Sequence, residues 1–112
     1  MDSEKIAQKI LEILEGKKAR DISAVNITNI SILADYFIIC SGTSTTHIRA
    51  LADEIDEKLS KEGYNCLHKE GYNTARWILL DYGEIIIHIF HEEDREFYNL
   101  DRLWSDGIVT YK

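Results

Sequence analysis

Residues 77–90 read WILLDYGEIIIHIF, which predicts two strands joined by a tight turn. Successive side chains of a strand point to opposite faces of a sheet. One face is then purely aliphatic and suits a core: Ile78, Leu80, Ile85, Ile87 and Ile89. The other face mixes aromatic, acidic and apolar groups: Trp77, Leu79, Asp81, Ile86, His88 and Phe90. Such a face suits a surface that a partner covers. The alternative is cover by another helix of the same domain, because Trp is often a core residue.

The rest of the sequence predicts helices and strands around this hairpin. Apolar residues recur at helical spacing from Ile6 to Leu14 and again from Ile48 to Leu59, and a glycine follows each stripe. The first predicted elements are a helix over 3–15 and strands over 21–27 and 35–41. A second helix then runs from a cap at Ser44 or Thr45 to about residue 62, with Gly63 after it. The last elements are a strand over 64–69, the two strands of 77–90 with their turn at 82–84, and a helix from about residue 92 to 104.

This order, α-β-β-α-β-β-β-α, predicts an α/β fold with a mixed five-stranded sheet and helices packed on it. The chain has 112 residues, of which 45% are hydrophobic, and it contains no proline; this suits a single domain over residues 1–112. The acidic run Glu92-Glu93-Asp94 is expected in the first turn of the last helix, where the helix dipole favours negative charge. Residues 105–112 are expected to form a loosely held tail.

Charge and cysteine content indicate the kind of partner and the compartment. The net charge is −7, from 13 Lys+Arg and 20 Asp+Glu, which favours a basic protein partner over a nucleic acid. No apolar run approaches the ~20 residues that span a bilayer, and the charged first residues do not read as a signal peptide. Cys40 and Cys66 form no disulfide framework, so reduced thiols in a cytoplasmic protein are expected.

A polar turn, SGTSTT over residues 41–46, separates a predicted strand from a predicted helix. Such a place can bind phosphate, because backbone N–H groups and the helix dipole attract anions. The Gly-Lys-Ser/Thr ending of a Walker loop is absent. The favoured interpretation is therefore a turn with a helix cap, and a nucleotide site is the alternative.

No spacing in the sequence predicts catalysis or a metal centre. His88 and His91 are three apart, so on a strand they point to opposite faces and do not chelate one ion. His47 or His68 would have to complete any such site through the tertiary fold. Cys66 and His68 share a strand face, and a reactive thiol there stays open. The expectation is a protein without catalytic residues, metal or cofactor.

Several linked motifs resemble the ribosomal silencing factor family, which includes the Iojap proteins. The similarity extends from about Lys18 to Trp104. Its motifs are ARDI at 19–22, ADYFIICSGTS at 34–44, EG at 70–71, WILLDYG at 77–83, IHIF at 87–90, REFYNL at 95–100 and LW at 103–104. Because the motifs follow the family's order, the match is more specific than a single short pattern.

The resemblance implies a factor that is not an enzyme. Members of the family bind the large ribosomal subunit through large-subunit protein fourteen, on the intersubunit face, and their bulk blocks joining of the small subunit when nutrients run short. Organellar relatives are tied to large-subunit assembly, and members are often homodimers. The family fold resembles the nucleotidyltransferase fold, yet the turn Gly42-Thr43-Ser44 is not followed by that fold's pair of acidic metal ligands.

The family's binding surface lies around the Trp-containing strand and its neighbour. Carried over by position, it implies contact by Trp77, Leu79, Asp81 and His88, with Glu70, Tyr82 and Phe90 beside them. Trp77 and Leu79 are expected to be apolar anchors, and Asp81 and Glu70 are expected to meet Lys or Arg of a basic ribosomal protein. His88 is expected to make a hydrogen bond. The same surface is expected to serve dimerisation in the free protein.

Overall fold

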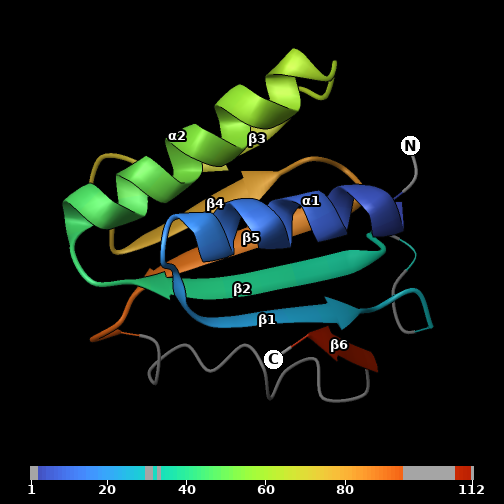
Figure 1. The fold of residues 1–112 in the computed structure, drawn as a ribbon, viewed down its shortest axis with the longest axis horizontal. Helices are drawn as coiled ribbons and strands as arrows, with labels where there is room; N and C mark the ends of the chain where they lie inside the picture. Colours follow the sequence, from blue (N-terminus) through green and yellow to red (C-terminus); the bar gives the residue numbers. More distant parts are fainter. Residues whose placement is uncertain (1–2, 30–31, 33, 95–107, 112) are drawn as a thin grey trace.

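The computed structural model describes residues 3–29, 32, 34–94 and 108–111 (Figure 1). Two helices lie over one face of a single sheet. The elements are α1 (Ser3–Gly16), β1 (Arg20–Asn26), β2 (Tyr36–Gly42), α2 (Thr45–Lys61), β3 (His68–Glu70), β4 (Trp77–Asp81), β5 (Ile85–His91) and β6 (Ile108–Tyr111). The first two predicted helices and all five predicted strands are present, so the predicted α/β class is confirmed.

The strands lie in the order β3-β4-β5-β2-β1-β6. Strands β2 and β5 pair in parallel, and every other neighbouring pair is antiparallel. The sheet is therefore mixed, as predicted. A parallel pair needs a long connection, and the chain makes it through α2, β3 and β4. This connection places the 77–90 hairpin between the short edge strand β3 and the centre of the sheet.

The C-terminal part corrects one prediction. Ile108–Tyr111, expected within a loosely held tail over 105–112, form β6 and pair antiparallel with β1, so the sheet has six strands. The sequence of β6, IVTY, has high strand propensity, and the edge of β1 offers it backbone N–H and C=O groups. At the expected start of the last helix, residues 92–94 form a turn. The remainder of that predicted helix, 95–104, lies outside the described residues.

The main core lies between the helices and the sheet. The predicted aliphatic face of β4 and β5 is confirmed, since it packs against the apolar stripes of α1 and α2 (Figure 1). The fully buried residues of this layer include Ile10, Leu14, Ile48, Leu51, Ile55, Leu59, Ile78, Leu80, Ile85, Ile87 and Ile89. Burial of each such side chain contributes roughly 1.5–3 kcal/mol. This layer therefore fixes which face of the hairpin the helices cover.

Local signals set the two ends of α2, as predicted. Ser44 is the N-cap, and its Oγ accepts a hydrogen bond from the His47 backbone N–H at 3.1 Å. After the last turn, Gly63 has a φ of 89°, and the N–H of Tyr64 donates to the Leu59 carbonyl at 2.9 Å. A glycine with positive φ is a common helix end. Strand β3 starts at His68, later than predicted.

Candidate functional site

The sheet face away from the helices carries most of the predicted contact residues. Residues paired in register on neighbouring strands place their side chains on the same face. The register across β3, β4, β5 and β2 gives three rows: Glu70-Leu79-His88-Ile39, His68-Asp81-Ile86-Phe37 and Trp77-Phe90-Ser41. We call these three rows the Trp77 face. It brings together six of the seven predicted contact residues, and only Tyr82 is missing.

Exposure on the Trp77 face rises from the centre of the sheet toward β3. Phe90 is fully buried and His88 is 5% exposed. Trp77 and Leu79 on β4 are half-buried, as is Asp81, and β3 is exposed along its whole length. The β3–β4 edge is therefore the accessible part of the face, whereas His88 and Phe90 lie in its buried centre.

Trp77, His88 and Phe90 form an aromatic cluster on this face. The ring centroids of Trp77 and Phe90 are 5.0 Å apart, and the rings of His88 and Phe90 are stacked at 6.3 Å. The indole Nε1–H of Trp77 donates a hydrogen bond to Nδ1 of His88 at 3.1 Å. An accepting Nδ1 carries no proton, so this contact assigns the proton of the neutral His88 ring to Nε2.

Burial keeps the His88 ring uncharged. The loss of hydration lowers the pKa of His88 from 6.5 to about 4, because an imidazolium is disfavoured away from water. Nε2 of His88 is buried and has no hydrogen-bond partner within the described residues. His88 is therefore a neutral acceptor toward Trp77 that carries an unused donor on its other nitrogen.

Asp81 shapes the turn between β4 and β5 in addition to carrying charge. Its Oδ1 accepts a hydrogen bond from the Gly83 N–H at 2.8 Å, and Gly83 has a φ of 88°. Its main-chain carbonyl accepts from the Leu67 N–H at 2.7 Å, just before β3. The role expected for Asp81 was a charged contact alone. The Asp-x-Gly spacing, typical of a side-chain-closed turn, is the signal for the second role.

Tyr82 is on the other side of the sheet from the predicted contact surface. It is 4% exposed, belongs to the core under the helices, and its hydroxyl donates to Oδ1 of Asp56 on α2 at 3.4 Å. Burial, followed by the charge of Asp56, raises the pKa of Tyr82 above the usual range of a phenol. Asp81 lies on the Trp77 face and Tyr82 is the next residue, so the alternation of side chains places Tyr82 on the helix-covered side, where it is found.

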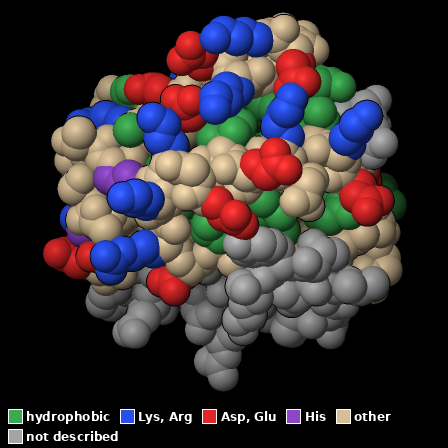
Figure 2. Space-filling view, viewed as in Figure 1, with side chains coloured by type: hydrophobic (Ala, Val, Ile, Leu, Met, Phe, Trp, Pro, Cys, Tyr) green, Lys and Arg blue, Asp and Glu red, His purple; other side chains and the backbone are tan. Residues whose placement is uncertain are grey.

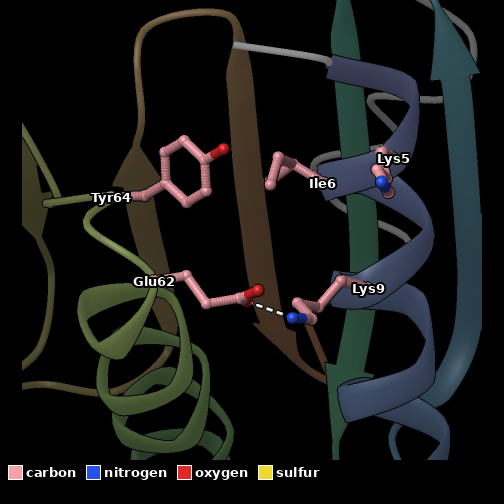
Figure 3. A pocket seen from close by; sticks show the side chains of 5 residues that line it. All are labelled: Lys5, Ile6, Lys9, Glu62 and Tyr64. Carbon is pink, nitrogen blue, oxygen red and sulfur yellow. Dashed lines mark hydrogen bonds and ion pairs between the residues drawn. The ribbon is translucent and has the colours of Figure 1, made fainter.

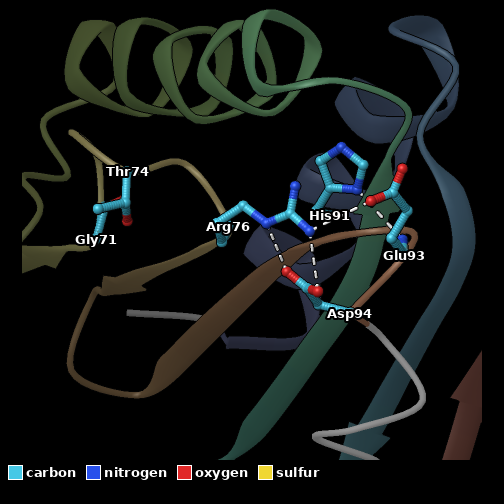
Figure 4. A network of polar contacts seen from close by, with 6 residues as sticks. All are labelled: Gly71, Thr74, Arg76, His91, Glu93 and Asp94. Carbon is cyan, nitrogen blue, oxygen red and sulfur yellow. Dashed lines mark hydrogen bonds and ion pairs between the residues drawn. The ribbon is translucent and has the colours of Figure 1, made fainter.

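Gly71 and Arg76 hold the loop that leads into β4 (Figure 4). Gly71 has a φ of 80°, and a Cβ there would lie 2.0 Å from the Trp77 carbonyl oxygen, so only glycine fits. Arg76 donates from Nε and Nη2 to the two carboxylate oxygens of Asp94, at 2.7 and 2.9 Å. These hydrogen bonds lower the pKa of Asp94.

The pairing of Arg76 with Asp94 was not predicted, and Asp94 was expected in a helix. No spacing rule links residues so far apart. The β4–β5 pairing brings them together, since Trp77 is opposite Phe90 and the His91 N–H donates to the Arg76 carbonyl at 2.8 Å.

The turn after β2 is closed by the protein's own side chains. The Thr43 N–H donates to Nδ1 of His47 at 3.0 Å, and Nε2 of His47 then donates to the Lys17 carbonyl at 2.8 Å. At Gly42, a Cβ would lie 2.7 Å from Cγ1 of Ile48. Two backbone donors of this turn, those of Thr43 and His47, are therefore already used within the chain. This geometry supports the turn-and-cap interpretation.

The described residues provide little for metal or thiol chemistry. No group of three or more His, Cys, Asp or Glu side chains is placed there to hold a metal ion. The Cys66 thiol donates to the His68 carbonyl at 3.1 Å, and burial raises the pKa of Cys66, so the reactive thiolate is disfavoured. Over the same residues, no helix is long and apolar enough to cross a membrane.

The helix-covered side presents a different surface. Figure 2 shows Lys or Arg side chains interspersed with Asp or Glu across it. A small pocket lies between α1 and the end of α2, lined by Lys5, Ile6, Lys9, Glu62 and Tyr64 (Figure 3). Lys9 and Glu62 form an ion pair with each other there. Charges that pair with one another suit a solvated surface, so the Trp77 face is the stronger candidate for binding.

Comparisons with known proteins agree on one family. Residues 1–111 match the family model described as "Ribosomal silencing factor during starvation". The chain is 38% identical to Ribosomal silencing factor RsfS of Bacillus subtilis, over 98% of this chain and 93% of the relative. It is 32% identical to "Mitochondrial assembly of ribosomal large subunit protein 1" of Mus musculus, over 86% of this chain and 43% of the relative. A crystal structure of a Chromobacterium violaceum protein matches with a TM-score of 0.90 and 28% identity, over 94% of this chain and 88% of that chain.

Proposed function

We propose that this chain, which belongs to the ribosomal silencing factor family, binds the large ribosomal subunit and blocks joining of the small subunit. This block would repress translation under nutrient limitation. One observation carries the choice of surface. At the β3–β4 edge of the Trp77 face, half-buried Trp77 and Leu79 lie beside the carboxylates of Asp81 and Glu70.

The partner that fits this edge is a basic protein, and we propose large-subunit ribosomal protein fourteen. An apolar centre with an aromatic anchor and a charged rim is the usual composition of a protein interface. The carboxylates of Asp81 and Glu70 complement Lys or Arg side chains and would steer the encounter. The net charge of −7 acts in the same direction and disfavours direct contact with RNA.

The mechanism we propose is steric. It requires affinity for the intersubunit face and a body large enough to obstruct the second subunit. The protein measures 34 × 33 × 23 Å along its principal axes. Binding through the Trp77 face would leave the helix-covered side pointing away from the large subunit, toward the position of the small one. No catalytic group is needed.

The test is co-sedimentation with isolated large subunits, isolated small subunits and joined ribosomes. The proposal predicts binding to large subunits alone and fewer joined particles when the protein is present. Trp77→Ala should weaken this binding by roughly 2 kcal/mol or more, as truncation of an aromatic anchor does. Tyr64→Ala is the matched control, since it removes an aromatic side chain from the pocket on the helix-covered side. Equal binding by wild type and Trp77→Ala would refute the site.

A second candidate, assistance in large-subunit assembly, is favoured by the name of the mouse relative, which refers to assembly of the mitochondrial large subunit. The same surface would serve both roles at different times. Cells that lack the protein distinguish them: an assembly factor predicts accumulation of incomplete large subunits during growth. A silencing factor predicts normal subunits and excess translation during starvation.

A nucleotide-binding enzyme is the weakest alternative. The Thr43 and His47 backbone donors of the turn after β2 are used by side chains of the chain itself. Calorimetric titration with ATP and Mg²⁺ should therefore give no binding heat. Clear saturable heat would revive this alternative. We place the protein in the cytoplasm, and fractionation of cells tests that placement.

A further inference from the structure

We infer that His88 is a positioning residue. Its Nδ1 accepts a hydrogen bond from the indole N–H of Trp77 and so holds this anchor in one orientation before docking. The inference rests on the proposed function, because the docked partner is the one proposed above. Its basis is the 3.1 Å hydrogen bond from Trp77 Nε1 to His88 Nδ1. Trp77 lies near the β3–β4 edge, whereas His88 is one strand further in.

The surroundings of His88 are unfavourable for an imidazole. The Phe37 ring packs edge-on at 5.0 Å between centroids, the Phe90 ring is stacked with the imidazole at 6.3 Å, and Ile39 is its fully buried neighbour on β2. Nε2–H is buried without a hydrogen-bond partner within the described residues. A buried unpaired donor destabilises the folded state. An apolar ring at position 88 would fit these neighbours without that loss.

What the imidazole adds over such a ring is the accepting Nδ1. A half-buried indole that is free to rotate loses conformational entropy when a partner immobilises it. The hydrogen bond to His88 and the contact with Phe90 at 5.0 Å restrict the Trp77 ring beforehand. The unpaired Nε2–H of His88 thus weakens the fold, whereas its accepting Nδ1 prepares the contact surface. Because the two effects come from different nitrogens of one ring, substitutions that keep or remove the acceptor separate them.

Two substitutions of His88 separate its shape from its acceptor. His88→Phe keeps a ring of similar size and removes both nitrogens. His88→Asn places an amide oxygen close to the position of Nδ1, so it keeps an acceptor for Trp77, and it removes Nε2. If packing alone matters, His88→Phe is the milder change; if the acceptor matters, His88→Asn is the milder change.

The experiment uses the full chain with Trp104→Phe, which leaves Trp77 as its single tryptophan. Time-resolved fluorescence anisotropy reports local motion of the Trp77 ring, titration with isolated large subunits reports affinity, and urea unfolding reports stability. For His88→Phe we expect unchanged or higher stability, faster ring motion and about three- to tenfold weaker binding, the range for one immobilised side chain. For His88→Asn we expect ring motion and affinity near those of the parent.

Several outcomes would overturn the inference. It is wrong if His88→Phe leaves ring motion and affinity unchanged, or if His88→Asn impairs both as much as His88→Phe does. A double-mutant cycle with Trp77→Phe, which lacks the N–H donor, gives a second test. On that background His88→Phe should not weaken binding further, and an undiminished further loss would contradict the hydrogen-bond role. Absence of binding by the parent would refute the proposed function, while anisotropy would still show whether His88 orients Trp77.

Discussion

Arg76 binds Asp94 with two hydrogen bonds, of 2.7 and 2.9 Å, across 18 residues of sequence. This ion pair joins the residue before β4 to the turn after β5, so it closes the open end of the hairpin that carries Trp77 (Figure 4). The His91 N–H donates to the Arg76 carbonyl at 2.8 Å and adds a main-chain link at the same place. The hairpin is therefore fixed at both ends, by this pair and by the Asp81–Gly83 contact.

Arg76→Met should lower the thermal unfolding midpoint at neutral pH, because it removes both hydrogen bonds to Asp94. The pKa of Asp94 is lowered by the pair, so the stabilisation is present above the ordinary carboxyl pKa of 3.8 and is lost as the pH falls through the folded-state pKa. Arg20→Met is the matched control, since the contact of Arg20 with Glu92 is longer, at 3.4 Å. Equal midpoints for the two variants at pH 7 would contradict the prediction.

Gly71→Ala should destabilise the fold by roughly 2 kcal/mol or more, because the new Cβ would need a positive φ and would meet the Trp77 carbonyl. Large-subunit binding should fall with it, since this backbone precedes the anchor. Gly16→Ala is the control, because nothing lies within 4 Å of a Cβ there. That variant should be neutral or slightly stabilising. Chemical denaturation measures both, and the same stability for both would count against the close approach at Gly71.

His88 should make the fold sensitive to acid. Its pKa is about 4 in the folded protein, against the ordinary histidine value of 6.5, so the unfolded chain binds the proton more readily. Protonation of His88 therefore leaves the free energy of unfolding unchanged above pH 6.5 and lowers it as the pH falls. The loss is complete below about pH 4 and totals about 3 kcal/mol. Unfolding of wild type and His88→Asn at several pH values isolates this change. Parallel curves between pH 7 and 4 would contradict it.

Glu70→Lys should slow association with large subunits by about tenfold at low salt, because it reverses a charge at the exposed edge of the proposed contact. Glu57→Lys makes the same change in net charge on α2, where Glu57 pairs with Lys61 at 3.3 Å, and should have a smaller effect. Stopped-flow association at two ionic strengths compares the variants. If both slow binding equally, the effect is one of total charge and not of this site.

The free protein should be a homodimer that uses the Trp77 face, so dimerisation and ribosome binding should compete. Sedimentation equilibrium should show that Trp77→Ala weakens the dimer, and added large subunits should convert dimer to bound monomer. A Trp77→Ala variant that remains a dimer but no longer binds large subunits would show that the two contacts use different surfaces.

The sequence by itself was sufficient to separate the two faces of the hairpin. Ile78 and Leu80 lie in the helix-covered core, whereas Trp77 and Leu79 lie on the opposite face, as the alternation predicts. The N-cap of α2 could be predicted as Ser44 or Thr45, and Ser44 is the cap in the structure. These features depend on backbone geometry within a few residues, and that geometry is the same in any sheet or helix.

Tertiary structure alone decided which of these residues are accessible and which touch. His88 and Phe90 are buried, while Leu79 in the next strand is half-buried, because exposure depends on where each strand lies in the sheet. The hydrogen bond from Trp77 to His88 depends on the β4–β5 register. The pairing of β6 with β1 joins segments far apart in the chain. Such contacts depend on strand order and register, which follow from packing of the whole chain and not from any local pattern.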